Sequence, residues 1–340
     1  MICYNPEIAG LIDITNHFNS VFKIKILSVT EKNNIPIALF AYARPDHLAR
    51  TLEGLRKSNV PLIYAFCDGA RDDSVVAQVK KVREILHTVD WARIFITERE
   101  SNLGLGTSVR AGVTEVLELH DKVIVIEDDI VMRPGAYDYA CSALNHYEND
   151  NRVMSVTMWN HPIMVPGGSE YGFFSERFMC WGWGTYRKYW QLYSGSIREI
   201  YYSLEPDVKD RVNKYGRDLF RQVDYSQIAN IWYAGYAFLH FKLGKLSYFP
   251  PEPLVVNIGK DHTAEHDGPG HTSYLENEDL ISVPVSMPVE NDFPEPLLLK
   301  RTARLFNRYF YLKHPFRVRV WRFLKKKMYF AYRPFKKYLG

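Results

Sequence analysis

Apolar and polar residues alternate along the first half of the chain in a pattern that predicts buried strands joined by amphipathic helices. Four apolar runs have the length and β-branched content of strands, and they cover residues 35–44, 61–70, 92–100 and 122–132. Three segments between them carry apolar residues at helical spacing, over residues 45–59, 73–89 and 102–119. This alternation predicts right-handed βαβ units and a mostly parallel sheet, hence an α/β fold.

The second half of the chain gives a weaker pattern. We expect a helix over 136–150, a strand over 153–160 and one helix near 217–243. The 340 residues suffice for one large domain, and no linker composition interrupts the chain before residue 285. We therefore expect a lead-in segment over 1–34 and one domain over 35–285, with a separate tail over 300–340.

Three adjacent carboxylates, Glu127, Asp128 and Asp129, follow the apolar residues of the fourth predicted strand. Ligands of open parallel sheets bind beyond the carboxyl ends of the strands, and this is where the acids lie. Three adjacent negative charges repel one another unless a cation balances them, and Mg²⁺ or Mn²⁺ prefers carboxylate and phosphate oxygens. The pattern favours a cation that holds a diphosphate, although a solvated strand end is the plainer alternative.

Composition narrows the class of protein. Apolar residues make up 46% and charged residues 24% of the chain, as in folded globular proteins. The four cysteines fit neither a zinc site nor a disulfide framework, so we expect reduced thiols in a cytoplasmic protein. Residues 1–18 lack the basic start and apolar run of a signal peptide, and no stretch is long enough to span a membrane.

The C-terminal residues 300–340 carry 14 Lys or Arg and no Asp or Glu, whereas the whole chain has a net charge of only +4. From residue 315 onward, apolar side chains recur at helical spacing between the basic ones. Such a helix lies at a membrane interface, with its basic face against anionic headgroups. We expect peripheral attachment to the inner face of the cell membrane, with packing on the body or nucleic-acid binding as alternatives.

Several motifs resemble those of nucleotide-sugar glycosyltransferases with the GT-A fold. The matching stretches are "ARPDHLARTLEGL", "CDG", "NLGLGTSVRAGVTEVL", "IEDDIVMRPGAYDY", "ENDNRVMSV", "FMCWGWGTYRKYW" and "NIGKDHTAEH", spread over about residues 35–267. The Glu-Asp-Asp form is similar to that of the N-acetylglucosaminyltransferase I-like enzymes, and related bacterial sugar transferases resemble the chain more closely still. The order and spacing of the motifs carry the resemblance.

The resemblance implies a role for each acid of the triplet. Asp129 would bind a divalent metal directly, while Glu127 and Asp128 would hold the ribose or the donor sugar. In such enzymes a histidine near the end of the domain also reaches the metal, and His266 in "NIGKDHTAEH" is the matching residue. Without the resemblance, His266 would more often be a solvated loop residue.

Two further residues would complete the nucleotide site if the resemblance holds. Asp68, at the end of the second strand, would contact the uracil or ribose, and Arg44 would neutralise the diphosphate from the first strand end. Trp181 or Trp183 in "CWGWG" would line the sugar or acceptor site, because indole faces stack on sugar rings, unless both belong to a buried aromatic cluster.

The general base is the point at which the sequence departs from the family. An inverting transfer needs a group that takes the proton of the acceptor hydroxyl. Relatives carry an acid just before a Trp in this region, but the matching residue here is Asn230, which cannot accept a proton. Asp224, earlier in the same predicted helix, is the alternative on chemical type, and impaired catalysis is another.

The resemblance thus implies a metal-dependent, inverting glycosyltransferase that uses a UDP-sugar. Membrane binding through the tail would suit a glycan or lipid-linked acceptor in the synthesis of surface polysaccharide or lipopolysaccharide. One alternative is a catalytically impaired, membrane-bound binding module. Another is a sugar-1-phosphate nucleotidyltransferase, which would need a glycine-rich loop after the first strand. The segment "FAYARPDHL" has no glycine there.

Overall fold

The computed structural model describes residues 34–160, 172–215, 218–259, 281–285 and 303–305. Within these ranges the strands form an eight-stranded sheet of order β3-β2-β1-β4-β8-β6-β9-β7 and a small two-stranded sheet of β10 and β5. The large sheet comprises β1 (Ile37–Ala41), β2 (Leu62–Cys67), β3 (Arg93–Glu98), β4 (Lys122–Glu127), β6 (Val153–Thr157), β7 (Phe173–Ser175), β8 (Trp183–Tyr186) and β9 (Leu246–Phe249). The predicted α/β fold with a mostly parallel sheet is confirmed.

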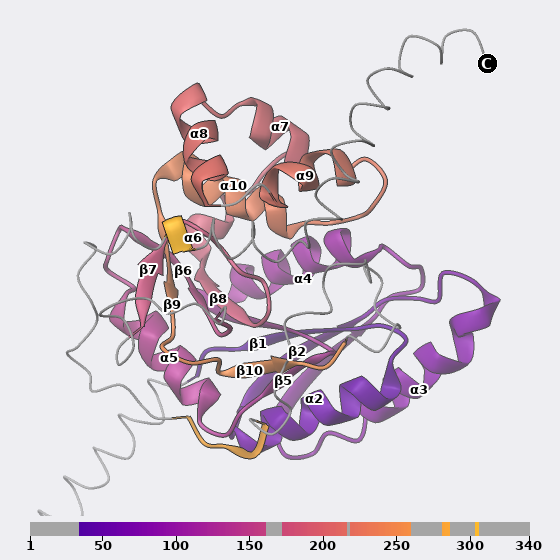
Figure 1. The fold of residues 1–340 in the computed structure, drawn as a ribbon. Helices are drawn as coiled ribbons and strands as arrows, with labels where there is room; N and C mark the ends of the chain where they lie inside the picture. The colour runs from indigo at the N-terminus through magenta and orange to yellow at the C-terminus, as the bar shows by residue number, and fades with distance from the viewer. Residues whose placement is uncertain (1–33, 161–171, 216–217, 260–280, 286–302, 306–340) are drawn as a thin grey trace, which may run out of the picture.

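The first half of the domain is built from βα units, as the sequence predicts. Strands β1 to β4 are parallel, with β1 paired between β2 and β4. The connecting helices are α2 (Pro45–Lys57), α3 (Val76–Leu86) and α4 (Leu105–Leu119), and the short 3-10 helix η1 (Asp73–Val75) precedes α3. Figure 1 shows α2 and α3 on one side of the sheet and α4 on the other.

The predicted strand over 122–132 is wrong as a single element. It is two strands, β4 and β5 (Ile130–Met132), separated by a turn at Asp128 and Asp129. The two strands belong to different sheets, because β4 pairs with β1 and β8, whereas β5 pairs antiparallel with β10 (Val255–Asn257). The acids therefore sit in the turn between the two sheets.

The second half of the chain completes the sheet by antiparallel and non-local pairing. Strand β8 lies antiparallel between β4 and β6, and β9 pairs parallel with β6 and antiparallel with β7. The helices of this half are α5 (Ala136–His146), α6 (Arg187–Trp190), α7 (Ile197–Tyr202), α8 (Pro206–Lys214), α9 (Asp218–Tyr225) and α10 (Tyr233–Leu243). The single helix predicted near 217–243 is therefore wrong, since α9 and α10 are separate, and Asn230 lies in their connection.

The core of this half contains a buried polar network around His240. The His240 Nε2 atom lies 2.9 Å from the Ser155 hydroxyl, which lies 2.8 Å from the Ser247 hydroxyl. The Nδ1 atom lies 2.9 Å from the carbonyl oxygen of Tyr236. Burial lowers the pKa of His240 to about 4, so the imidazole is neutral at pH 7. The network gives both ring nitrogens of this buried histidine a hydrogen-bond partner, and its side chains have no exposure to solvent.

No helix of the described chain is long and apolar enough to cross a membrane. The lead-in over 1–33, His266 and the basic tail from 306 lie outside the described residues. The predictions made for them remain predictions.

Candidate active site

The carboxyl ends of β1 and β4 bring Arg44 against the acidic turn. The Arg44 guanidinium forms a close ion pair with Asp128 through Nη2, and its Nη1 lies 3.0 Å from Asp129 Oδ2. Burial alone would lower the pKa of Arg44, but the two carboxylates outweigh it and raise this pKa above its ordinary value. Two of the three predicted acids thus share one cation from the neighbouring strand end.

Asp128 is buried at the carboxyl edge of the sheet and is positioned by several hydrogen bonds. Its side chain is only 4% exposed, and its Oδ2 accepts a hydrogen bond of 3.2 Å from the backbone N–H of Tyr42. Its backbone carbonyl accepts a bond of 2.8 Å from Thr51 of α2. Burial raises the pKa of Asp128, and the positive charge of Arg44 opposes that rise. Both carboxylate oxygens of Asp128 therefore already have partners.

Asp129 lies where β10 leaves the small sheet. Its backbone carbonyl accepts a bond of 2.8 Å from the N–H of Ile258, and the next residue, Gly259, packs directly on its carboxylate. A Cβ at position 259 would lie 2.1 Å from Asp129 Oδ2, so this close approach requires glycine. The segment that carries His266 begins at this contact, although His266 itself is outside the described residues.

The "CWGWG" segment reaches the same edge from the other side. Burial and the nearby Glu127 carboxylate raise the pKa of the Cys180 thiol, which places this segment beside the triplet. Trp181 is partly exposed and packs edge-on against Trp159, with ring centroids 4.7 Å apart. Of the two predicted tryptophans, only Trp181 is therefore accessible.

Trp183, predicted to line the sugar or acceptor site, is instead fully buried. Its indole stacks on Trp232 with ring centroids 5.1 Å apart and meets Phe178 edge-on at 5.1 Å. It belongs to β8, where it pairs with Val125 of β4 and fills the core. The alternative of a buried aromatic cluster holds for this residue, because a side chain without exposure cannot contact a sugar.

Asp68 ends β2 and is 5% exposed, with both carboxylate oxygens engaged by protein groups. Oδ1 accepts a bond of 3.0 Å from Arg99, and Oδ2 accepts one of 3.1 Å from the backbone N–H of Leu103. Its predicted contact with uracil or ribose stays a prediction. Asp68 also anchors the glycine-rich turn through Leu103, a contact that no local pattern of the sequence indicates.

In the glycine-rich turn that leads into α4, three backbone N–H groups donate hydrogen bonds to acceptors within the protein. Besides Leu103, the N–H of Gly104 donates to Asn102 at 3.0 Å, and that of Gly106 donates to the carbonyl of Asn230 at 3.0 Å. A phosphate cradle needs free N–H groups, and these three already have acceptors within the protein, which argues against the nucleotidyltransferase alternative.

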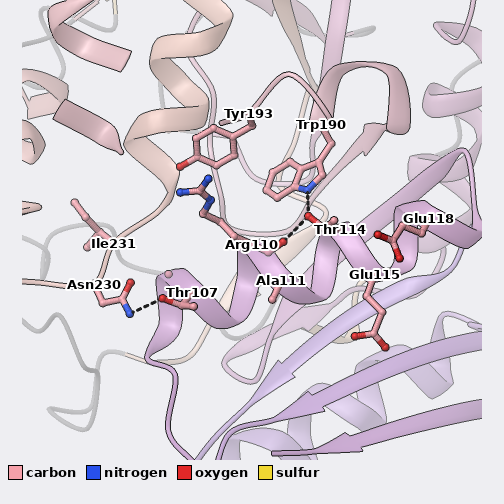
Figure 2. A pocket seen from close by; sticks show the side chains of 11 residues that line it. Thr107, Arg110, Ala111, Thr114, Glu115, Glu118, Trp190, Tyr193, Asn230 and Ile231 are labelled. Atoms are coloured by element: carbon pink, nitrogen blue, oxygen red, sulfur yellow. Dashed lines mark hydrogen bonds between the residues drawn. The ribbon is translucent and has the colours of Figure 1, made fainter. Parts of the chain in front are cut away.

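A groove of about 570 Å³ runs along α4 from the glycine-rich turn (Figure 2). Its lining residues are Gly106, Thr107, Arg110, Ala111, Thr114, Glu115, Glu118, Trp190, Tyr193, Asn230 and Ile231. The Arg110 guanidinium lies over the Tyr193 ring, 4.6 Å from its centroid. Of the two candidate bases, Asn230 lines this groove. Asp224 is exposed on α9, where its charge acts on Tyr201 of α7.

The acidic turn suits a hard cation in chemistry. Carboxylate oxygens of Glu127 and Asp129 are ligands that Mg²⁺ and Mn²⁺ accept. However, the described residues contain no group of three or more His, Cys, Asp or Glu side chains arranged to hold a metal ion. Arg44 already balances Asp128 and Asp129, so a cation bound by Asp129 would either share this carboxylate with Arg44 or displace Arg44 from it.

Comparison with known proteins adds one sequence relative. No protein-family model matches the chain. The chain is 23% identical over 235 residues to an alpha-1,3-mannosyl-glycoprotein 2-beta-N-acetylglucosaminyltransferase of Arabidopsis thaliana. The match covers 64% of this chain and 51% of that protein, so the chain spans about half the length of its curated relative.

Solved structures give more distant similarities. The mannosyltransferase PcManGT from Pyrobaculum calidifontis, in complex with GDP-Man and Mn²⁺, is 12% identical with a TM-score of 0.33, over 48% of this chain and 47% of that one. A UDP-glucose pyrophosphorylase complexed with UDP-glucose is also 12% identical with a TM-score of 0.33, over 65% and 92%. TM-scores this low decide nothing between the two. The sequence relative, together with the α/β fold, confirms the resemblance to GT-A glycosyltransferases that the motifs indicate.

Proposed function

We propose that the chain is a metal-dependent glycosyltransferase that moves a sugar from a nucleotide-sugar donor, with UDP as the nucleotide, to a hydroxyl of a glycan or lipid-linked acceptor. The observation that carries the proposal is the acidic turn between β4 and β5, which meets Arg44 at the carboxyl edge of a parallel sheet. The sequence similarity to an N-acetylglucosaminyltransferase supports it.

Each residue at this edge then has a defined task. Asp129 would hold Mn²⁺ or Mg²⁺, and a divalent cation there would neutralise the diphosphate and stabilise it as a leaving group. Glu127 would contact the ribose or the donor sugar. Arg44, released from Asp129, would bind the diphosphate through its guanidinium. Asp128 would stay in place to orient the ribose or the sugar, because Tyr42 and Thr51 hold it.

The finer parts of the proposal rest on the sequence. An acceptor in surface polysaccharide or lipopolysaccharide synthesis, an inverting outcome and attachment to the inner face of the cell membrane follow from the basic tail and the motifs. A cytoplasmic location agrees with the free thiols of Cys67, Cys141 and Cys180.

The test is a panel of UDP- and GDP-sugars incubated with the full chain and Mn²⁺, with release of free nucleotide as the readout. Asp129→Asn should abolish Mn²⁺-dependent release and Mn²⁺-dependent nucleotide binding. The matched control is Asp121→Asn, because Asp121 is exposed just before β4 and pairs only at the surface with Arg187 among the described residues. The control should keep both.

Other outcomes separate the alternatives. Release of pyrophosphate from UTP and a sugar-1-phosphate would indicate a nucleotidyltransferase. Nucleotide binding without turnover for any donor would indicate the binding module. If no nucleotide binds at all, or if Asp129→Asn behaves as the control does, the proposed site is wrong.

A further inference from the structure

Asn230 joins the connection between α9 and α10 to the glycine-rich turn. Its side-chain Nδ2 donates to the carbonyl of Leu103 at 2.9 Å and to the hydroxyl of Thr107 at 3.1 Å, the second bond being visible in Figure 2. Its backbone carbonyl accepts from the N–H of Gly106 at 3.0 Å. One residue thus satisfies three groups at the start of α4, which has no side-chain cap of its own.

The two glycines of the turn fit around this amide. A Cβ at Gly104 would lie 2.4 Å from Asn230 Nδ2, and all of its three nearest atoms belong to the Asn230 side chain. A Cβ at Gly106 would lie 2.5 Å from Asn230 Oδ1. The "NLGLG" sequence is therefore explained by close packing against Asn230 at both glycines and, at Gly104, also by a backbone φ of +75°, which favours glycine.

The glycine-rich turn also contacts Asp68, which lies at the edge of the sheet where the nucleotide is proposed to bind. Leu103 receives Asn230 at its carbonyl and donates its N–H to Asp68 Oδ2 at 3.1 Å. Asp68 ends β2, two strands from β4 in the sheet order. The chain of contacts from Asn230 through Leu103 to Asp68 connects the helices of the second half to the carboxyl edge of the first half.

We propose that Asn230 is a positioning residue that fixes the glycine-rich turn, and through it Asp68, and that it does not stand in for a proton acceptor. The inference rests on the proposed function, because it assigns Asp68 to the nucleotide edge. The chemistry of the contacts supports it: the carbonyl of Leu103 needs a donor, which an amide supplies and a carboxylate does not. The charged side chains that share the groove with Asn230 are Arg110, Glu115 and Glu118, all on α4.

The substitution Asn230→Asp should change turnover in opposite directions for the two possible roles of this position, a positioning residue or a proton acceptor. For a positioning residue, the variant should weaken UDP binding and lower turnover by roughly tenfold at pH 8, because a carbonyl loses its donor and faces a charge. Lowering the pH to about 4, the ordinary pKa of an aspartic acid, should recover part of the UDP affinity relative to the wild type, since a protonated carboxyl donates again. For a proton acceptor, the variant should instead exceed the wild-type rate, increasingly so as the pH rises. That result would overturn the proposal.

Two further measurements keep the test decisive. The control Asn213→Asp adds the same charge at an exposed position of α8 and should change neither UDP affinity nor turnover. Thermal unfolding of Gly104→Ala, Asn230→Ala and the double variant should be non-additive, because removing the amide removes the two nearest atoms that the new Cβ would meet, whereas the strain of Ala at a φ of +75° is the same in both Gly104 variants. Additive effects would overturn the contact itself. This arm needs no nucleotide, so a wild-type protein that binds none would refute the proposed function separately.

Discussion

Replacement of Arg44 by Met tests whether this guanidinium and a divalent cation share the same carboxylates. In the protein without a metal, Arg44 is the positive charge against Asp128 and Asp129, and the Arg44 side chain is 20% exposed. Met keeps much of the length and the apolar stem of the side chain but leaves both carboxylates without their cation.

The cost follows from the burial of Asp128. Its side chain is 4% exposed, and breaking a buried ion pair by removing one partner costs about 3–5 kcal/mol. For a domain of this size each kcal/mol shifts the melting temperature by about 2–4 °C, so a loss of roughly 10 °C is expected. Burial already raises the pKa of Asp128, and losing Arg44 would raise it further. The added penalty therefore applies where the carboxyl is ionised and should shrink as the pH falls and the carboxyl becomes protonated.

The assay is thermal unfolding with and without Mn²⁺. Because Mn²⁺ can replace the guanidinium on Asp129, a hundredfold excess over the Kd of the variant should stabilise Arg44→Met by about 2.7 kcal/mol, and the same Mn²⁺ concentration should stabilise the wild type by less. The control is Arg56→Met on α2, whose exposed ion pair with Glu53 should contribute little to the melting temperature. Equal Mn²⁺ shifts in variant and wild type would show that Arg44 and the metal do not compete for Asp129, and the proposed release of Arg44 from Asp129 would be wrong.

Three other predictions concern the core, the base and the tail. His240→Gln should flatten the pH dependence of stability: because burial holds the pKa of His240 near 4, the folded wild type binds fewer protons than the unfolded chain and should lose about 2 kcal/mol between pH 7 and pH 5. A variant with the same acid slope as the wild type would refute this. If Asp224 takes the acceptor proton, Asp224→Asn should lower turnover by roughly two to four orders of magnitude, and an unchanged rate clears it of that role. A chain ending at residue 299 should keep nucleotide binding but stop co-sedimenting with anionic liposomes, unless the tail packs on the body.

The sequence predicts the first half of the fold well because its strands and helices alternate regularly and each carries a clear apolar pattern. The apolar run at 35–44 and the leucines of 45–59 suffice to place β1 and α2, since a parallel sheet buries both faces of its strands. The turn within 122–132 could not be seen, because the apolar pattern is the same on both sides of it. Only the pairing partners, β1 and β10, separate β4 from β5.

The residue types of the site and their positions at strand ends could be predicted from the sequence, but the contacts between the residues could not. Arg44, Asp128 and Asp129 were expected at neighbouring strand ends, and the structure brings them together. That Trp183 lies in the core could not be known, because "CWGWG" has the same composition whether it forms a loop or the strand β8. The contact of Asn230 with Leu103 spans 127 residues, a separation for which no local pattern exists.

The order of strands in the large sheet has a consequence for biosynthesis. Strands β1 to β4 occupy one side of the sheet and come from the part of the chain that is synthesised first, while β6 to β9 occupy the other. The two sides meet along one ladder, in which Lys122 to Val125 of β4 pair with Trp183 to Tyr186 of β8. Until about sixty further residues have left the ribosome, the apolar edge of β4 has no partner from its own chain. Nascent chains held at this stage should depend on chaperones, and slowing translation between β4 and β8 should promote aggregation.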